Sequence, residues 1–279
     1  MSRSAHVPAW LPLLAAAATL AGPARSAVDR PLWELGVGAS ALSLPHYRGA
    51  ERSRRWLLPM PWAVYRGEVL RANREGLKAR LVDSERIDFD LSVAATAPSR
   101  SADEPVRAGM ADLAGTLEFG PNLNLRLAGA PGWKLEARLP LRAAMTLESR
   151  ARGIGWSAMP NLNLDLARGP WNIGAQFGLP WGSRRLHGHF YDVPAADATA
   201  ARAAYQARGG RGGWQATLGA SRRDGDRWFG AFMRADSVSG AVFEDSPLVR
   251  RSRSWSLGVA YAWILWQSGR LVPDPDEIR

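Results

Sequence analysis

The sequence contains no cysteine in its 279 residues. This absence excludes a disulfide framework, a thiolate metal site and a lipid anchor attached to cysteine. Histidine is scarce, with four residues, and no run of about 18 apolar residues occurs beyond the N-terminus. We therefore expect no transmembrane helix in the mature chain.

Acidic residues are outnumbered, with 26 Asp and Glu against 36 Lys and Arg, which gives a formal charge of +10. Residues 1–27 resemble a secretory signal peptide, with Arg3, an apolar run from Val7 to Ala21, and small residues around Ser26. Cleavage would remove Arg3 and Arg25 and no acid, which lowers the charge to +8. A secreted basic chain is more suited to anionic lipid or lipopolysaccharide phosphates than to nucleic acid.

The sequence is organised around an alternating stretch near the C-terminus, from Ser254 to Trp266. Large apolar side chains fall on one face and small ones on the other. The large ones are Trp255, Leu257, Val259, Tyr261, Trp263 and Leu265. Such a strand suits a wall with lipid outside and a tight lumen inside. A strand of a soluble sandwich is the alternative, which the rest of the chain decides.

Similar alternation runs through residues 113–127, 133–147, 156–166 and 171–181. Strands of soluble proteins commonly have about 5–6 residues, whereas strands that cross a bilayer at a tilt need about 9–11. Tight turns at 129–132, 168–170 and 224–226 alternate with long stretches at 97–111, 183–212 and 240–252. Short periplasmic turns and long outer loops alternate in this way in outer-membrane barrels.

These patterns predict an all-β fold, a transmembrane antiparallel β-barrel of the bacterial outer membrane, after a cleaved signal peptide. A count of about twelve strands requires residues 69–82 to break at Asn73-Arg74-Glu75-Gly76, and about ten strands is the alternative. We expect a signal peptide at 1–27, the barrel at 28–266 and a short periplasmic tail at 267–279. The strand Trp255–Trp266 should pair with the first strand, Leu32–Leu42, to close the barrel.

Most of the 13 tryptophans lie near expected strand ends, where an indole ring can meet lipid while its N–H meets water. Near periplasmic ends are Trp33, Trp133, Trp171, Trp228, Trp263 and Trp266, and near outer ends are Trp56, Trp156, Trp181, Trp214 and Trp255. A soluble core would not space tryptophan by strand ends, so this distribution favours the barrel.

The lumenal face is expected to carry charges of both signs and two asparagine pairs. The charged residues are Asp88, Asp90, Glu118, Lys134, Glu136, Arg138, Arg142 and Asp165, and the asparagines are Asn122, Asn124, Asn161 and Asn163. A wide pore would more usually show a constriction of one sign. Mixed charge indicates a lumen filled by its own hydrogen-bonded network.

Catalytic and metal chemistry have weak support. His187-Gly188-His189 has a metal-like spacing, and Ser183 lies near it in sequence. No acidic partner and no third ligand can be assigned, so solvated loop residues are the simpler interpretation. We predict no catalytic, metal or cofactor-binding residues.

Arginines crowd the first and last outer loops. They are Arg48, Arg52, Arg54 and Arg55 in the first and Arg250, Arg251 and Arg253 in the last. Because the first and last strands of a closed barrel are neighbours, these loops should lie side by side. Guanidinium groups there could bind lipopolysaccharide phosphates, and a solvated basic rim is the alternative.

Short motifs along the chain resemble those of the MipA/OmpV outer-membrane proteins, the MltA-interacting protein and its relatives. They are Leu35-Gly36-Val37-Gly38, Pro45-His46-Tyr47-Arg48-Gly49-Ala50, Leu58-Pro59-Met60-Pro61 through Tyr65-Arg66, Leu117-Glu118-Phe119-Gly120-Pro121, Ala204-Tyr205-Gln206-Ala207-Arg208-Gly209-Gly210 and Asp245-Ser246-Pro247-Leu248-Val249. The sequence departs from the family in one place. His46 and Arg48 stand where the family usually has acids, and Ala50 stands where it has Ser.

The resemblance implies a non-enzymatic barrel with a scaffolding role in the cell envelope. By this resemblance its partners would be a periplasmic murein transglycosylase and a peptidoglycan synthase, and no cofactor is implied. Two other functions stay open from sequence: a narrow channel for small solutes, and a rim enzyme that acts on outer-leaflet lipid.

Overall fold

The computed structural model describes residues 29–66, 70–73, 76–79, 82–83 and 87–273. The predicted signal peptide and residues 274–279 of the predicted tail lie outside the described residues. No helix in the described part of the chain is both long enough and apolar enough to cross a membrane.

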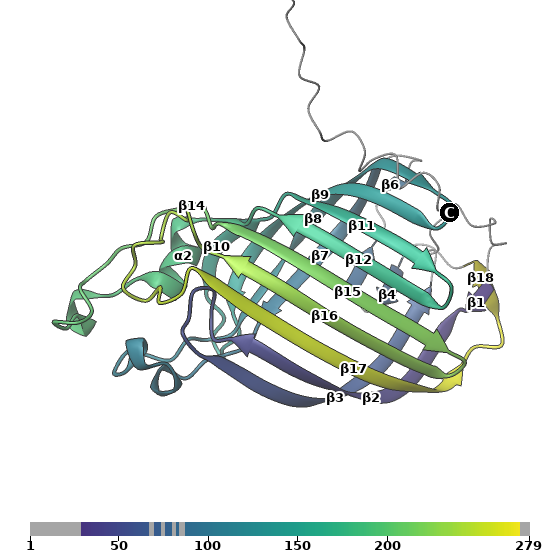
Figure 1. Ribbon diagram of the computed structural model, residues 1–279, viewed down its shortest axis with the longest axis horizontal. Coiled ribbons are helices and arrows are strands. Elements are labelled where there is room, and N and C mark those ends of the chain that lie inside the picture. Colours follow the sequence, from purple (N-terminus) through teal and green to yellow (C-terminus); the bar gives the residue numbers. More distant parts are fainter. Residues whose placement is uncertain (1–28, 67–69, 74–75, 80–81, 84–86, 274–279) are drawn as a thin grey trace, which may run out of the picture.

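The chain folds into one large antiparallel sheet that contains 16 strand segments among the described residues. They are β2 (Trp33–Pro45), β3 (Ser53–Arg66), β4 (Leu70–Asn73), β5 (Gly76–Ala79), β6 (Val82–Asp83), β7 (Ile87–Thr96), β8 (Thr116–Ala130), β9 (Trp133–Thr146), β10 (Gly153–Ala158), β11 (Asn161–Arg168), β12 (Trp171–Gly178), β13 (Trp181–Gly182), β14 (Gly210–Arg211), β15 (Trp214–Asp224), β16 (Arg227–Ser237) and β17 (Arg253–Gln267). The strands are tilted, and the long ones run beside their sequence neighbours (Figure 1).

Four pairs of these segments are single strands with one interruption. β10 and β11 both pair with β9 and are separated at Pro160, and β13 follows β12 after Pro180. Gly213, whose φ is 89°, separates β14 from β15. β5 and β6 both lie along β7. Sixteen segments thus correspond to twelve strands, and the predicted break at residues 73–76 is confirmed because β4 ends at Asn73 and β5 begins at Gly76.

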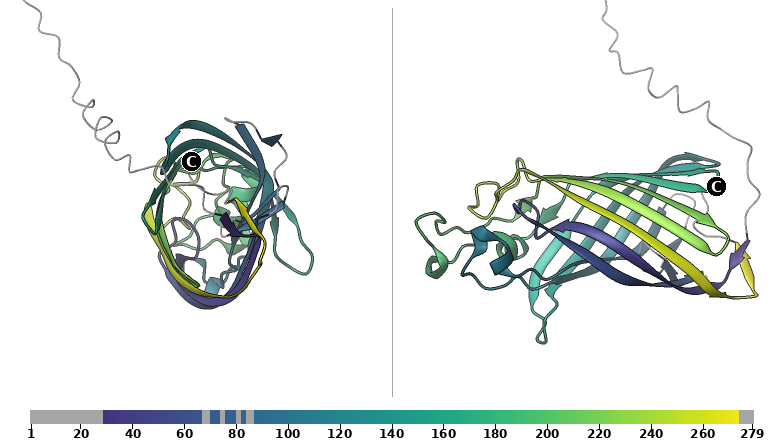
Figure 2. Two further views of the ribbon diagram at one scale, coloured as in Figure 1. Left: turned by 90° about the vertical axis from the view of Figure 1, so that its right-hand side faces the viewer. Right: turned by 60° about the horizontal axis from the view of Figure 1, so that its bottom comes forward.

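The first and last long strands pair as the sequence predicts. β17 forms an antiparallel ladder with β2, in which Tyr261 lies opposite Ala39 and Trp263 opposite Val37. Seen along its axis, the sheet curves round into an oval barrel (Figure 2). The fold is a β-barrel with tight turns at one end, where Gly169 and Gly225 adopt φ of 58° and 55°, and long loops at the other.

Exposure follows the predicted alternation. In β17 the outward residues Trp255, Leu257, Val259, Tyr261 and Trp263 are all exposed, while on the lumenal face Ser256 and Ala262 are fully buried. Leu139 on β9 and Phe177 on β12 are also exposed outside the barrel. A sheet that buries its small residues and exposes its large apolar ones is suited to a lipid solvent.

Trp228 corrects the predicted distribution of tryptophan. It was expected at the membrane interface, but it is 9% exposed and packs inside the barrel against Trp62, with ring centroids 5.1 Å apart. Its even position in β16 places it on the lumenal face, because its neighbour Phe229 is exposed. Proximity to a strand end fixes the depth of a side chain but does not fix its face.

A small second sheet lies at the end that carries the tight turns. β1 (Asp29–Pro31) pairs with β18 (Leu271–Pro273), so residues from both ends of the described chain meet there (Figure 1). The sequence predicts only a short extension after residue 266, whereas β17 reaches Gln267 and part of that extension is a strand.

Candidate functional site

The four longest loops fold onto one another beyond the outer ends of the strands (Figure 1). We call residues 46–52, 97–115, 183–209 and 238–252 the outer cap. They share an apolar core made of Tyr47, Ala50, Leu113, Tyr191, Val193, Ala207, Val238, Ala241, Phe243 and Leu248. The described loops contain helix α2 (Arg184–Tyr191) and the 3-10 turns η2 (Ser101–Asp103), η3 (Pro105–Arg107) and η4 (Ala195–Asp197). The outer loops therefore form a folded layer with its own core.

Aromatic residues join the loops of the outer cap. Tyr191 stacks on Phe243 with ring centroids 3.8 Å apart. The Tyr191 hydroxyl donates to the carbonyl of Arg48 over 2.9 Å, and the Tyr47 hydroxyl donates to the carbonyl of Leu248 over 2.8 Å. Burial raises the pKa of both tyrosines well above the usual value, so both remain protonated donors.

Two buried arginines satisfy backbone carbonyls within the outer cap. Arg202 Nη1 donates to the carbonyls of Val106 and Ala108 over 2.8 and 3.0 Å. Arg107 donates to the carbonyls of Phe190 and Ala111, and burial lowers its pKa. Loops of this length contain many carbonyls without a strand partner, and the guanidinium forks supply the missing donors.

The histidines of the outer loops are structural. His187 is 7% exposed, and its Nδ1 donates to the carbonyl of Arg208 over 2.8 Å. His189 Nε2 lies 3.1 Å from the carbonyl oxygen of Ala114. Burial is the main cause that lowers the pKa of each ring. Among the described residues no group of three or more His, Asp or Glu side chains could hold a metal ion.

The structure brings the first and last outer loops together, as the pairing of the first and last strands predicts. The backbone N–H groups of Arg250 and Arg251 donate to the carbonyl of Gly49 over 2.8 and 3.1 Å. The side chains of Arg52, Arg55, Arg250, Arg251 and Arg253 are exposed, and Arg54 lies over the Trp56 ring at 4.2 Å. We call these six residues the basic rim.

The sequence places Arg48 among the arginines of the first outer loop, but its guanidinium has other partners than the basic rim. Nε donates to Asp236 over 3.0 Å, and Nη2 donates to the carbonyls of Trp214 and Ser237. Asp236 also accepts from Arg234 over 2.8 Å and has a fully buried side chain. Arg48 thus ties the outer cap to the barrel wall.

The lumen contains the predicted network of mixed charge. Arg138 donates to Glu136 over 2.7 Å and lies 3.5 Å from Asp165, while Lys134 pairs with the same two carboxylates. Asn122 and Asn124 both donate to Asp90, and Asn163 donates to Asp165. These asparagine side chains therefore bond residues of their own strand or of the adjacent strand.

Nearer the periplasmic end, Glu34 forms ion pairs with two arginines from different strands. Its buried carboxylate pairs with Arg66 over 3.0 Å and with Arg223 over 2.7 Å. Trp62 Nε1 also donates to it, and Trp62 packs on Trp228 and Ile264. Because β3 and β16 are separated by β2 and β17, these contacts reach across part of the lumen.

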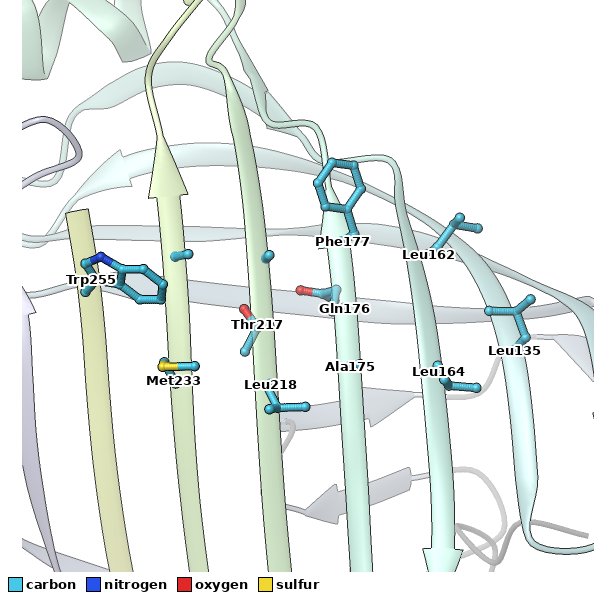
Figure 3. Close-up of a pocket in the computed structure, with 12 residues that line it drawn as sticks. Leu135, Leu162, Leu164, Ala175, Gln176, Phe177, Thr217, Leu218, Met233 and Trp255 are labelled. Atoms are coloured by element: carbon cyan, nitrogen blue, oxygen red, sulfur yellow. The ribbon is translucent and has the colours of Figure 1, made fainter. Parts of the chain in front are cut away.

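One apolar depression lies on the lipid-facing wall. It encloses about 420 Å³ between Trp255, Met233, Leu218 and Phe177, over Ala175. Figure 3 shows that its lining comes from a row of neighbouring strands. Its surface is apolar, as a lipid-facing wall requires.

The family described as MltA-interacting protein MipA matches residues 37–265. The chain belongs to the MipA family. It is accordingly an outer-membrane protein, and the predicted location and barrel fold are confirmed. No curated protein matches the chain.

Solved outer-membrane barrels resemble it in fold alone. An outer membrane channel from Pseudomonas putida F1 is 13% identical with a TM-score of 0.46, over 88% of this chain and 100% of that chain. The Pseudomonas putida toluene transporter TodX is 11% identical with a TM-score of 0.33, over 83% and 88%. Outer membrane phospholipase A from Escherichia coli is 10% identical with a TM-score of 0.31, over 84% and 94%.

The family motifs that are scattered in this MipA sequence meet in the outer cap. Tyr47, Ala207 and Leu248 come from three motifs and belong to one apolar core. The Tyr205 hydroxyl donates to Asp245 over 2.7 Å, and burial together with this bond raises the pKa of Tyr205 to about 12. Sequence analysis found the motifs but not this shared core, whose only sequence signal was apolar residues inside long polar loops.

Proposed function

We propose that this MipA family member is a non-enzymatic structural protein of the outer membrane. It binds lipopolysaccharide through the basic rim and serves as a scaffold for murein enzymes at its periplasmic end. The outer cap is the observation that carries the proposal, because a loop layer with its own buried core suits a fixed structural part better than an open mouth. The family description, MltA-interacting protein, supports a murein transglycosylase as one partner.

The two alternative functions have less support. A channel is disfavoured by the contacts between Trp62 and Trp228 and between Glu34 and Arg223, which occupy part of the lumen. A rim enzyme is disfavoured because His187 and His189 are both engaged with backbone carbonyls.

The sheet of β1 and β18 is the element that we assign to the murein partner. It contains two strands among the described residues, so each strand has one edge without a partner inside that sheet. An extended segment of another protein can add to such an edge through backbone hydrogen bonds. The periplasmic end is where murein enzymes would meet this edge.

Deletion of residues 268–279 tests this assignment. The deletion removes β18 and leaves β17 complete to Gln267, so the barrel should still insert. A purified transglycosylase of the MltA type should bind the full-length protein and bind the deletion variant severalfold more weakly. Tyr191→Phe, at the opposite end, is the control and should bind normally. Equal binding by the full-length and deleted proteins would refute the role of β18, and no binding by either would refute the scaffold.

Replacement of four rim residues tests the lipopolysaccharide contact. In the variant Arg52→Gln, Arg54→Gln, Arg250→Gln and Arg251→Gln, less lipopolysaccharide should co-purify at low salt, because charge-assisted bonds to phosphate are lost. High salt should weaken the wild type in the same direction. The matched control replaces Arg126, Arg168, Arg222 and Arg227, which lie near the periplasmic end. If both variants retain as much lipopolysaccharide as the wild type, the rim is only solvated.

A further inference from the structure

The barrel wall is uneven between β3 and β7. Only twenty residues, 67–86, connect these strands. β4 and β5 have four residues each, whereas β3 has 14 and β8 has 15. Since a strand rises about 3.3 Å per residue, a hairpin made from this segment cannot reach the outer rim beside β3.

The outer part of β3 has one partner strand. Its ladder with β2 is regular and runs from the pair of Ser53 and Pro45 to the pair of Tyr65 and Trp33. On its other side β4 pairs only with Tyr65 and Arg66, so in the described part of the chain residues 53–64 have no strand there. β7 pairs with β8 along its length and with β6 only at Asp88 and Phe89, and the four-residue β5 lies beside it without a ladder in the described part of the chain.

Two prolines lie on this free edge. Pro59 and Pro61 are two residues apart in the regular ladder, opposite Ala39 and Val37. A proline nitrogen has no hydrogen to donate to β2, and its ring is tolerated where the nitrogen faces away from the neighbouring strand. The edge therefore lacks two N–H groups that would otherwise be unsatisfied in lipid. The same feature prevents another strand from completing a ladder there.

Loop contacts bridge the gap at the outer end. The N–H of Arg52 donates to Glu104 Oε2 over 3.2 Å, and His46 Nδ1 lies 2.5 Å from Ser99 Oγ. Both contacts join the loop before β3 to the loop after β7. We call the opening framed by β3, β7, these contacts and the β4–β5 hairpin the lateral window.

Exposure of a lumenal side chain marks the lateral window. Leu58 is on the same face of β3 as the buried Trp62 and Val64, yet it is 39% exposed. On the lumenal face of β17, Ser256 is 0% exposed. The neighbouring Leu57, which points outward, is 81% exposed. The edge of β3 is therefore apolar and accessible on both faces.

We propose that the lateral window admits an acyl chain of lipopolysaccharide from the outer leaflet into the outer part of the lumen. Arg54 and Arg55 lie at the outer end of the same strand and Arg52 immediately precedes it, where the phosphate groups of that lipid would be. The phosphate binds these arginines while the chain lies along Leu57 and Leu58. The inference rests on the proposed lipopolysaccharide contact and adds its place and its mode. The contacts around Trp62 and Glu34 end the path below, so the site holds a chain without conducting it.

The absence of native cysteine allows a direct test with the full-length barrel. Single variants Leu58→Cys, Ser256→Cys and Val259→Cys are labelled with a benzophenone, returned to membranes that contain lipopolysaccharide, and irradiated. Val259 faces lipid and serves as the positive control, and Ser256 is fully buried on the lumenal face of β17, separated from β3 by β2, and serves as the negative control. Leu58 should cross-link to lipopolysaccharide nearly as well as Val259 and severalfold better than Ser256.

Each other outcome has a defined meaning. Cross-linking at Leu58 no stronger than at Ser256 would overturn the lateral window, and the rim could still bind lipopolysaccharide in the co-purification assay. Cross-linking at Leu58 to phospholipid alone, or to a second protein chain, would overturn the assigned occupant. Adding Arg52→Gln, Arg54→Gln and Arg55→Gln should reduce the cross-link at Leu58 and leave that at Val259 unchanged. An unchanged cross-link at Leu58 would refute the phosphate contact.

Discussion

Leu139 and Arg138 are adjacent in β9 and face different surroundings. Leu139 is 47% exposed on the outer wall, while Arg138 bonds Glu136 and Asp165 in the lumen. Successive side chains of a strand point to opposite faces, so one position separates lipid from a charged network.

Leu139→Arg should destabilise the barrel by about 2–4 kcal/mol if the residue lies near the bilayer midplane. Arg138→Leu should cost less, because Lys134 remains within 3.1 Å of Glu136 and 3.8 Å of Asp165. Refolding into lipid vesicles at increasing urea concentration measures both. Equal losses would contradict the assigned faces of β9.

His187 makes the outer cap sensitive to acid. Its Nδ1 proton is used in the bond to the Arg208 carbonyl, and its Nε2 lies against Gly182, where an added Cβ would approach to 2.5 Å. Burial first, and the charge of Arg48 as well, lower its pKa. His187 therefore binds a proton less readily in the folded state than in the unfolded state, where the pKa of histidine is about 6.5.

The outer cap should accordingly be most stable above about pH 6.5 and should lose stability as the pH falls further, because the unfolded loop gains the proton first. Hydrogen exchange of residues 183–209, corrected for intrinsic rates, should show faster opening near about pH 5 than at neutral pH. His187→Gln retains a donor and should reduce this difference, with His189 responsible for the remainder. A difference that His187→Gln leaves unchanged would assign the acid response to other groups.

At the scale of elements, β17 holds the barrel closed. It pairs with β16 on one side as far as Trp263 and with β2 on the other as far as Gln267. β18 pairs only with β1 in the described chain, outside the large sheet. The two segments are neighbours in sequence but contribute to different structures.

Deletion of residues 267–279 should leave membrane insertion intact, whereas deletion of 261–279 should abolish it. The longer deletion removes the partners of Gly36, Val37 and Gly38 in β2 and leaves that edge open in lipid. Heat-modifiable mobility on gels distinguishes folded from unfolded barrels. A folded band for the longer deletion would show that β17 is not needed for closure.

At the scale of the whole molecule, two obstacles lie in series along the barrel axis. The outer cap buries Leu248 completely, and the lumenal cluster buries Trp62 and Trp228. Either obstacle restricts a path along the axis, so opening one should leave the other in place.

In planar bilayers the wild type should therefore show little conductance. Leu248→Asp places a charge in the core of the outer cap and should raise conductance only slightly, because the lumenal cluster remains. The combination with Trp62→Ala and Trp228→Ala should raise it much more than the sum of the separate effects. Stable, large conductance of the wild type would instead favour the channel.

Sequence alone determined the features that depend on the alternation of side chains along a strand and on the spacing of turns. The alternation from Trp255 to Leu265 fixed the lipid face, because side chains of a strand alternate whatever the neighbours are. The spacing of tight turns narrowed the count to ten or twelve strands, since each antiparallel strand must return to its starting side, and the structure decided for twelve through the break at 73–76. The pairing of the first and last strands followed from closure.

The tertiary structure decided what depends on contacts between distant residues. Tyr47 bonds the carbonyl of Leu248, 201 positions away, and Arg48 bonds Asp236, 188 positions away. No local pattern distinguishes Arg48 from the exposed Arg52. Their roles depend on which loop or wall lies opposite, and that is set only when the barrel closes and the loops pack on one another.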